Sequence, residues 1–238
     1  MTKTAPSVSN TGAGLPGVSI PDQIAAVART PDAAGGHDFA ELLAQVSGES
    51  AFKPHAVNKH TGAAGPFQFV KNTWLSLVKQ HGEAMGVKPE LLAQIKTDAH
   101  GRLTIANPHA LKEVLDLRHD LSLSAKMAAK YLDENKAHLA RILHRDPSEA
   151  EVQISFLLGP SGAAHLINAA KNTPEAPVDQ IMPKAVASNR SLFRDHQGHT
   201  MTAGQAVAHL AARYRADKAK FAAYAALETK PAPSKIEA

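Results

Sequence analysis

The chain has no cysteine among its 238 residues, which excludes disulfide bonds, thiolate metal sites and cysteine nucleophiles. Aromatic residues make up only 5% of the chain. Because β sheets favour aromatic and β-branched side chains whereas alanine favours helices, the composition indicates an all-α fold. No apolar run approaches the roughly 18 residues that a membrane-spanning helix needs, so we expect no membrane span.

Charge of either sign is not strongly in excess. Lys and Arg number 26 and Asp and Glu number 22, a formal net charge of +4. This balance is typical of a solubilising surface, and it also permits attraction to an acidic polymer. The sequence shows no pattern of interleaved basic and aromatic residues that is typical of nucleic-acid binding. We therefore expect no nucleic-acid partner.

Histidine is frequent, with 13 residues, but its spacing does not predict a metal site. The closest pairs are His55 with His60 and His196 with His199. Neither pair has the i, i+4 spacing beside a carboxylate that a helical zinc site uses. We therefore expect no metal and no cofactor. Separately, we expect the protein to be a monomer.

The distribution of Gly and Pro and the hydrophobic periodicity divide the chain into three parts. Residues 1–35 are rich in Gly, Pro and Ser without a hydrophobic period and predict a flexible N-terminal arm. Residues 36–228 predict one helical domain with a C-terminal helical extension, and residues 229–238 a tail. The domain's first helix carries an apolar stripe of Phe39, Leu42, Leu43 and Val46, and a Gly- and Pro-rich loop over 53–68 follows.

Later helices are indicated by their boundaries, and no segment alternates long enough to predict a strand. Asn107 before Pro108 is typical of a helix start, and capping boxes are predicted at Ser148 with Glu151 and Thr202 with Gln205. The remaining expected helices carry Trp74, Leu77 and Val78 before Gly82; Leu91, Leu92 and Ile95 after Pro89; residues from about Ser122 to Leu132; and a last stretch reaching roughly Leu227.

Glu49 continues the apolar stripe of the first helix to the point where the Gly-rich loop begins. Burial penalises a charged carboxylate, so the pKa of Glu49 should be raised and the side chain could act as a general acid near neutral pH. The alternative is a helix-end residue turned to water, which is the common environment of glutamate.

The segment from Gly48 to Phe69, GESAFKPHAVNKHTGAAGPFQF, resembles the catalytic signature of the soluble lytic transglycosylase and goose-type lysozyme superfamily. A weaker resemblance lies in SFLLGPSG, Ser155 to Gly162, where Phe156 and Leu157 replace the family's usual Tyr and Asn. A diffuse one includes Asn189 and Phe193. The residues matched in the first segment are Glu49, Ser50, Phe52, Pro54, Ala56, Val57, Gly62, Ala63, Gly65 and Gln68.

The resemblance implies a lysozyme-like helical domain with irregular loops after the catalytic helix. It also implies cleavage of the β-1,4 bond between N-acetylmuramic acid and N-acetylglucosamine in peptidoglycan glycan strands. Glu49 would be the acid and base, forming 1,6-anhydro ends. Substrate contacts are implied for Ser50, Gln68, Gly65, Phe67 and Phe156, although Gly65 also suits a positive-φ turn and Phe67 the core.

Two other functions compete with this one. A hydrolysing muramidase needs a second carboxylate, whereas residues 50–82 contain no Asp or Glu, which favours the transglycosylase. Glu113, Asp116 or Asp120 would have to fold into the cleft to supply it. The replacements at Phe156 and Leu157 favour instead a non-catalytic peptidoglycan-binding or virion structural protein.

Peptidoglycan lies outside the inner membrane, yet the first residues lack the continuous apolar region of a Sec signal. We therefore expect action in the periplasm or cell wall after release by a phage holin, delivery in a virion, or a specialised secretion or flagellar route. Components of such a route would then be partners.

A basic cluster on the last helix, Arg213, Arg215, Lys218 and Lys220, is either a solvated face or a docking patch for an anionic polymer or a protein.

Overall fold

The computed structural model describes residues 55–59 and 61–228, and most of them are helical. This confirms the all-α class. The predicted N-terminal arm, the first helix with Glu49 and the C-terminal tail lie outside the described residues. Within residues 55–59 and 61–228, no helix has the length and apolar character needed to cross a bilayer.

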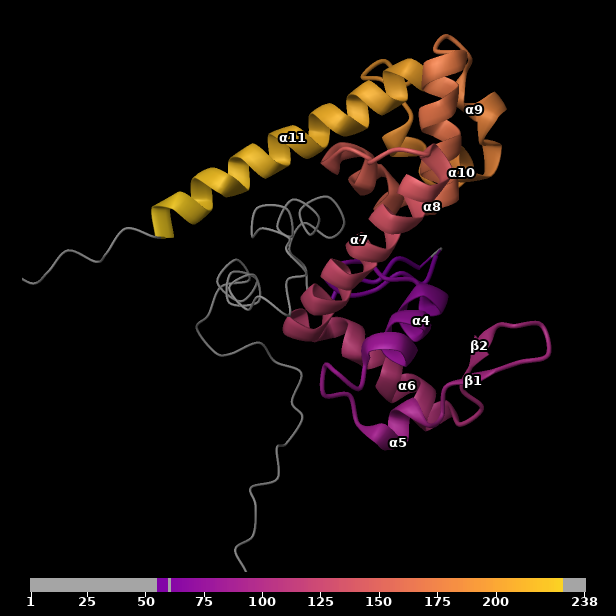
Figure 1. The fold of residues 1–238 in the computed structure, drawn as a ribbon, viewed down its shortest axis with the longest axis vertical. Coiled ribbons are helices and arrows are strands. Elements are labelled where there is room, and N and C mark those ends of the chain that lie inside the picture. The colour runs from indigo at the N-terminus through magenta and orange to yellow at the C-terminus, as the bar shows by residue number, and fades with distance from the viewer. Residues whose placement is uncertain (1–54, 60, 229–238) are drawn as a thin grey trace, which may run out of the picture.

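The first part of the fold packs around a single tryptophan. It comprises α4 (Lys71–His81), α5 (Pro89–Leu92), α6 (Pro108–Asp116) and η1 (Leu117–His119), with a small hairpin of β1 (Lys96–Thr97) and β2 (Leu103–Thr104) at its edge (Figure 1). Trp74 is fully buried and its indole N–H donates to the Val114 carbonyl over 2.7 Å. Trp74 is therefore a core residue, as the helical spacing predicts.

Two long helices connect this part to the rest. They are α7 (Leu121–Leu143) and α8 (Glu149–Asn172), which pack against each other. Helix α8 is kinked at Gly159, whose φ of 72° and ψ of 158° are open essentially only to glycine, and Pro160 follows. The kink redirects the second half of α8 into the upper part of the molecule (Figure 1).

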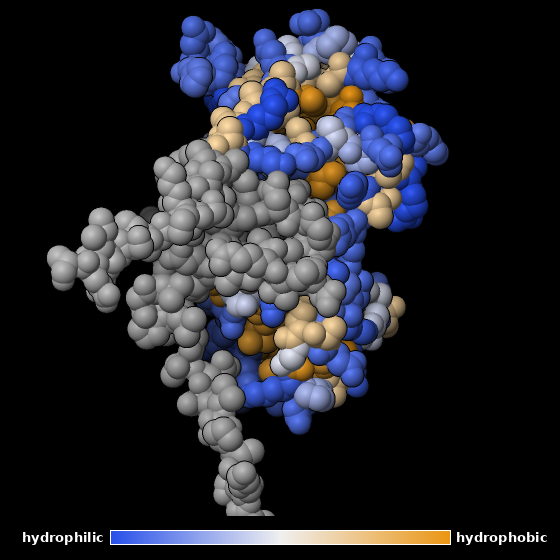
Figure 2. Space-filling model, turned by 60° about the vertical axis from the view of Figure 1, so that its left-hand side comes forward, coloured by the Kyte–Doolittle hydropathy of each residue, from blue (hydrophilic) through white to orange (hydrophobic). Residues whose placement is uncertain are grey.

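The upper part contains α9 (Val178–Ile181), α10 (Pro183–Ser188), η2 (Arg190–Leu192) and α11 (Ala203–Glu228). Its hydrophobic cluster is distinct from the one around Trp74. On the face drawn in Figure 2, apolar residues reach the surface in both the upper and the lower part. The buried members of this second cluster are Leu139, Ile154, Ala163, Ala164, Leu166, Ile167, Val178, Val186, Phe193, Met201, Ala203, Ala206 and Leu210.

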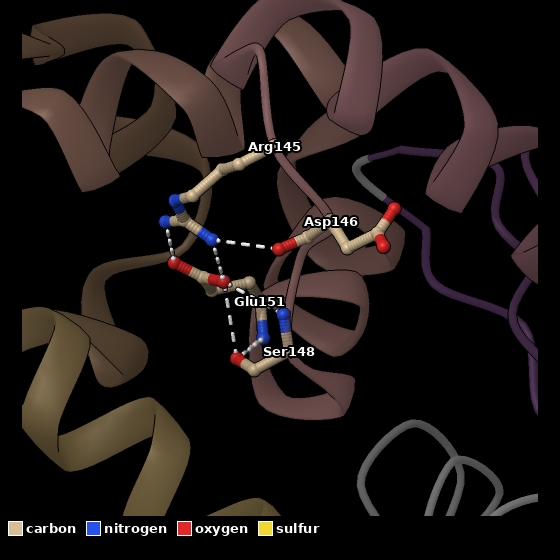
Figure 3. Close-up of polar contacts among 4 residues, drawn as sticks. All are labelled: Arg145, Asp146, Ser148 and Glu151. Carbon is tan, nitrogen blue, oxygen red and sulfur yellow. Dashed lines mark hydrogen bonds and ion pairs between the residues drawn. The ribbon is translucent and has the colours of Figure 1, made fainter.

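Helix boundaries that depend on local capping agree with the sequence. The Asn107 side chain accepts hydrogen bonds from the His109 and Ala110 amides at the start of α6. Ser148 and Glu151 form the reciprocal capping box of α8 (Figure 3). The corresponding pair before α11 is also formed, since Thr202 N–H donates to Gln205 and Gln205 N–H donates to Thr202.

Elements that depend on tertiary packing differ from the prediction. Helix α5 ends at Leu92 rather than continuing to Ile95, which is buried beyond its end. Helix α7 extends to Leu143, eleven residues beyond the predicted end. The hairpin was not predicted, because two-residue strands leave no alternating pattern; Asp98 closes its turn by accepting from the His100 and Arg102 amides.

Candidate functional site

A cleft of about 540 Å³ lies at the junction of the two parts. Its volume is within the roughly 300–1,000 Å³ of small-ligand sites. Distant segments of the chain meet in it: the loop before α4, the kink of α8, the segment from α10 to η2, and α11. Its lining residues are Asn58, Thr61, Ala63, Phe67, Gln68, Phe69, Val70, Thr73, Tyr131, Phe156, Leu157, Gly159, Ser188, Asn189, Ser191, Leu192 and Arg213.

The loop that forms one wall is tightly turned. Gly62 and Gly65 have φ of 70° and 80°, and Gln68 has φ of 48°. Isolated antiparallel bridges pair Ala64 with both Val57 and Phe69. Over residues 55–59 and 61–68, the predicted loop is thus a compact set of turns with backbone hydrogen bonds of its own.

Arg118 of η1 holds this loop through side-chain hydrogen bonds. Its guanidinium donates to the carbonyls of Gly62 and Phe69 over 2.9 and 3.0 Å. Burial lowers the pKa of Arg118, the opposing effect coming from Asp116. Arg118 was not predicted, because its partners lie about fifty residues away and its neighbours Asp116, His119 and Asp120 make the segment an ordinary polar one.

Gly65 meets the same arginine through its backbone. A Cβ at Gly65 would lie 2.0 Å from the Arg118 carbonyl oxygen, so no larger residue fits. Gly65 is not among the residues that line the cleft, although a substrate contact was expected of it. Its structural role is to allow the close approach of loop and η1 at a positive φ.

Gln68 lies in the cleft wall, and its amide nitrogen is committed to the loop. The Nε2 group donates to the Ala56 carbonyl over 3.1 Å and to the Gly65 carbonyl over 2.8 Å. The side chain therefore ties both ends of the loop together. A contact with a bound molecule would come from the amide oxygen.

Aromatic rings form a second wall. The Tyr131 ring stands edge-on to Phe156 with centroids 5.1 Å apart, and Phe69 lies 5.9 Å from Phe156. Burial raises the pKa of Tyr131, while hydrogen bonds with Asn135 and Thr73 oppose the shift. Phe67 is only 1% exposed, so this expected substrate contact is mainly a core residue at the base of the cleft.

Tyr131 was not singled out from the sequence, because its place on α7 gives no local sign of the cleft. The structure brings its ring against Phe156, the position at which the signature that this segment weakly resembles has a tyrosine. The cleft therefore contains a phenol beside Phe156, contributed by another helix.

The remaining wall is polar. Ser188, Asn189 and Ser191 come from the segment joining α10 and η2, and Arg213 comes from α11. Asn189, which belongs to the diffuse resemblance, lies here, whereas Phe193 is buried in the second cluster. The basic cluster on α11 is divided: Arg213 lines the cleft, and Lys218 forms an ion pair with Glu149 over 2.8 Å.

Three carboxylates considered for a hydrolytic mechanism lie elsewhere. Glu113 pairs with Lys88, Asp116 pairs with Lys112, and Asp120 caps α7 through the Leu123 amide. Glu113 and Asp120 line a different surface hollow, of about 410 Å³, beside α5. None of the three contributes to the cleft.

The structure thus brings together Gln68, Phe67 and Phe156 of the predicted site. Glu49 and Ser50 lie outside the described residues. Across residues 55–59 and 61–228, no group of three or more His, Asp and Glu side chains is placed to hold a metal ion. No protein-family model matches the chain.

Proposed function

We propose that the protein is a peptidoglycan lytic transglycosylase with a lysozyme-like fold, in which Glu49 is the single acid and base. The site of action would be the periplasm or cell wall. The proposal starts from the ordered resemblance of residues 48–69 to the catalytic signature of that superfamily.

The observation that supports it most is the meeting of two segments about ninety residues apart. Gln68 comes from the segment that resembles the catalytic signature, and it lines one cleft with Phe156, Leu157 and Gly159 of the segment with the weaker resemblance. A chance match of a short motif would not require its distant counterpart to lie across the same cavity.

In the proposed reaction, the Glu49 carboxyl donates its proton to the glycosidic oxygen as the C1–O4 bond breaks. The muramoyl C6 hydroxyl then attacks C1, and the Glu49 carboxylate takes the proton from that hydroxyl. The products are a free 4-hydroxyl and a 1,6-anhydro ring, and no water is consumed. A single carboxylate suffices, unlike the two used by ordinary glycosidases.

The positions of other carboxylates favour this route over hydrolysis. Glu113, Asp116 and Asp120 are occupied in ion pairs or a helix cap outside the cleft. A water-activating base would therefore have to come from some other residue. Among the described residues that line the cleft, the charged one is Arg213.

The test is product analysis of purified peptidoglycan digested by the full-length protein and by Glu49→Gln. Glu49→Gln keeps the shape of the side chain and removes the transferable proton, so the release of muropeptides should fall by about 100-fold or more. Glu83→Gln is the matched control, because Glu83 is exposed beyond the end of α4 and outside the cleft; it should keep the parent rate.

Mass spectra of the parent digest should show muropeptides with 1,6-anhydromuramoyl ends. Reducing ends would show instead a hydrolysing muramidase. Sacculi bound without release of muropeptides would show a non-catalytic binding protein. Parent-like lysis by Glu49→Gln would refute the role of Glu49.

A further inference from the structure

We infer that Tyr131 is a specificity-determining residue whose hydroxyl donates a hydrogen bond to the carbonyl oxygen of a 2-acetamido group of the glycan. The inference rests on the proposed function and names the substrate group that this wall of the cleft binds. Residue spacing along α7 does not mark Tyr131 for this role, whereas its surroundings in the cleft do.

Two aromatic neighbours fix the ring of Tyr131 in the cleft wall. The ring stands edge-on to Phe156, with centroids 5.1 Å apart and planes at 71°, and edge-on to Phe69, at 6.1 Å and 73°. Both separations are typical of favourable edge-to-face pairs. All three residues line the cleft. The ring therefore cannot turn away from the cavity without losing both contacts.

Polar neighbours determine which hydrogen-bonding function of the hydroxyl remains for a ligand. Burial raises the pKa of Tyr131, and hydrogen bonds with Asn135 and Thr73 oppose that rise. A hydrogen bond acts in this direction when its partner donates to the phenol oxygen, because it then stabilises the phenolate. Two such donors use the two acceptor positions of the phenol oxygen. The function that is left is the donor, the phenolic O–H.

The other contact of Asn135 agrees with its role as a donor. This side chain is only 2% exposed, and its Nδ2 group also donates to the Ser155 carbonyl over 3.4 Å. An amide nitrogen has two protons, one for each of these oxygens. Among residues 55–59 and 61–228, no acceptor is hydrogen-bonded to the proton of Tyr131. A carbonyl oxygen of a molecule in the cleft can therefore accept it.

The chemistry around this hydroxyl suits an acetamide better than a sugar hydroxyl. An acetamide has a carbonyl acceptor, an N–H donor and an apolar methyl group. Tyr131 provides the donor for the carbonyl, and the oxygen of Thr73, which also lines the cleft, can accept from the N–H. Phe156 and Leu157 provide apolar surface for the methyl group. Both the phenol and the amide are neutral, so no charge has to be desolvated.

The glycan of peptidoglycan carries this group on both of its sugars. N-acetylglucosamine and N-acetylmuramic acid each have an acetamido group at C2. The two groups offer the same chemistry to Tyr131. Deacetylases that act on one sugar or the other remove them separately, so the experiment can tell which of the two is bound.

The experiment compares the parent protein with Tyr131→Phe, which keeps the ring contacts and removes the hydroxyl. Tyr214→Phe is the matched control, because Tyr214 is buried on α11 and is not among the residues that line the cleft. Three preparations of soluble glycan strands are used: native strands, strands without the acetyl group on glucosamine, and strands without it on muramic acid. Portions of the two treated preparations are re-acetylated with acetic anhydride. Release of muropeptides gives kcat and KM, and sedimentation with the corresponding sacculi gives binding.

On native strands, Tyr131→Phe should lower kcat/KM roughly 3- to 10-fold, as expected for loss of one hydrogen bond between neutral groups. The loss should appear in KM, with kcat near the parent value, because the acetamido group takes no part in the proposed bond breaking. On strands without the bound acetyl group, the parent and Tyr131→Phe should have equal values, and re-acetylation should restore the difference. The preparation on which they become equal identifies the sugar. Tyr214→Phe should match the parent throughout.

Thr73→Val is a second variant, which leaves Tyr131 in place and removes the oxygen that accepts from the amide N–H. It should lower kcat/KM about 2- to 5-fold on native strands and should depend on the same acetyl group. A merely structural role of the two hydroxyls predicts instead equal losses on all preparations, together with a lower urea midpoint of Trp74 fluorescence.

Equal losses of Tyr131→Phe on every preparation, or no loss on native strands, would overturn the inference and leave the proposed function intact. If the parent releases no muropeptides from any preparation, the proposed function fails. Sedimentation then decides the inference separately. Binding to sacculi that depends on both the Tyr131 hydroxyl and the acetyl group supports it, and binding that is absent or indifferent to either one overturns it.

Discussion

Close packing between Gly65 and the Arg118 backbone determines how far the cleft loop can approach η1. The positive φ of Gly65 costs a residue with a side chain about 1–2 kcal/mol by itself. The carbonyl oxygen only 2.0 Å from the expected Cβ position adds a second, steric cost. Gly62 has a similar φ of 70°, but no atom of residues 55–59 or 61–228 lies within 4 Å of that position, so among these residues the two glycines separate backbone strain from crowding.

Substitution of each glycine by alanine should therefore give different losses of stability. Gly62→Ala is expected to lower the free energy of unfolding by about 1–2 kcal/mol, and Gly65→Ala by about 3–4 kcal/mol, because overpacking adds to the strain. Urea denaturation followed by Trp74 fluorescence measures both. Equal losses for the two variants would show that contact with Arg118 does not limit the loop.

At this scale, the sequence predicted residues whose role is local. Gly65 was recognised as suited to a positive-φ turn, and Gln68, for which the resemblance implied a substrate contact, lines the cleft. Arg118 and Tyr131 were missed, because each reaches the site through partners distant in the chain. A buried arginine bonded to two loop carbonyls has no signature in residue spacing.

At the scale of elements, the start of α8 combines a capping box with an arginine fork (Figure 3). Arg145 donates to both carboxylate oxygens of Glu151, over 2.8 and 2.5 Å. The Ser148 amide also donates to that carboxylate over 2.8 Å. Hydrogen bonds from Arg145 and Ser148 lower the pKa of Glu151 against the opposing effect of burial. The charged carboxylate is thus the form that stabilises the fold.

This arrangement predicts a pH-dependent contribution to stability. Because the folded-state pKa of Glu151 lies below its unfolded value near 4.5, the contribution is complete above that value and disappears as the pH falls through the lower folded-state pKa. Glu151→Gln should lower the free energy of unfolding by about 1 kcal/mol at pH 7, as for loss of a helix cap. The difference from the parent should shrink steadily below pH 4.5.

Glu149 is the matched control, since it lies in the same first turn and its carboxylate, which pairs with Lys218, is more exposed than that of Glu151. Glu149→Gln should cost less than about 0.5 kcal/mol at pH 7, as for exposed ion pairs. Denaturant titrations at pH 7, 5 and 3.5 make the comparison. A Glu151→Gln deficit that persists unchanged at pH 3.5 would contradict the role of the carboxylate charge.

The elements show why some boundaries were predictable and others were not. The caps at Asn107, Ser148 and Thr202 act within three residues, so the sequence pattern contains all the information they need. The extension of α7 to Leu143 depends on Leu139 packing in the second cluster. The FLLGP segment was noted for its family resemblance, but the kink at Gly159 depends on the two clusters that α8 must enter.

For the whole molecule, the two hydrophobic clusters are connected by shared helices. Helix α7 places Leu132 in the Trp74 cluster and Leu139 in the other, and α8 does the same with Val152 and Ile154. Helix α11 contributes Leu210 to the second cluster and Tyr214 to the first. Loss of one cluster therefore removes the support of helices that build the other. The cleft lies at the junction of the two parts, so its walls depend on both clusters.

Unfolding should consequently be one cooperative transition in both parts. Trp74 is the only tryptophan and reports on the first cluster, while circular dichroism at 222 nm reports on helices of both. Leu166→Ala removes a fully buried side chain of the second cluster and should cost about 2–5 kcal/mol. Leu166→Ala should lower the urea midpoint measured by Trp74 fluorescence as much as the midpoint measured by circular dichroism, although Leu166 belongs to the other cluster.

Leu75→Ala, in the first cluster, should also shift both signals together. If Leu166→Ala leaves the fluorescence midpoint in place and makes the circular dichroism transition biphasic, the two parts unfold separately, and the shared helices do not couple the walls of the cleft.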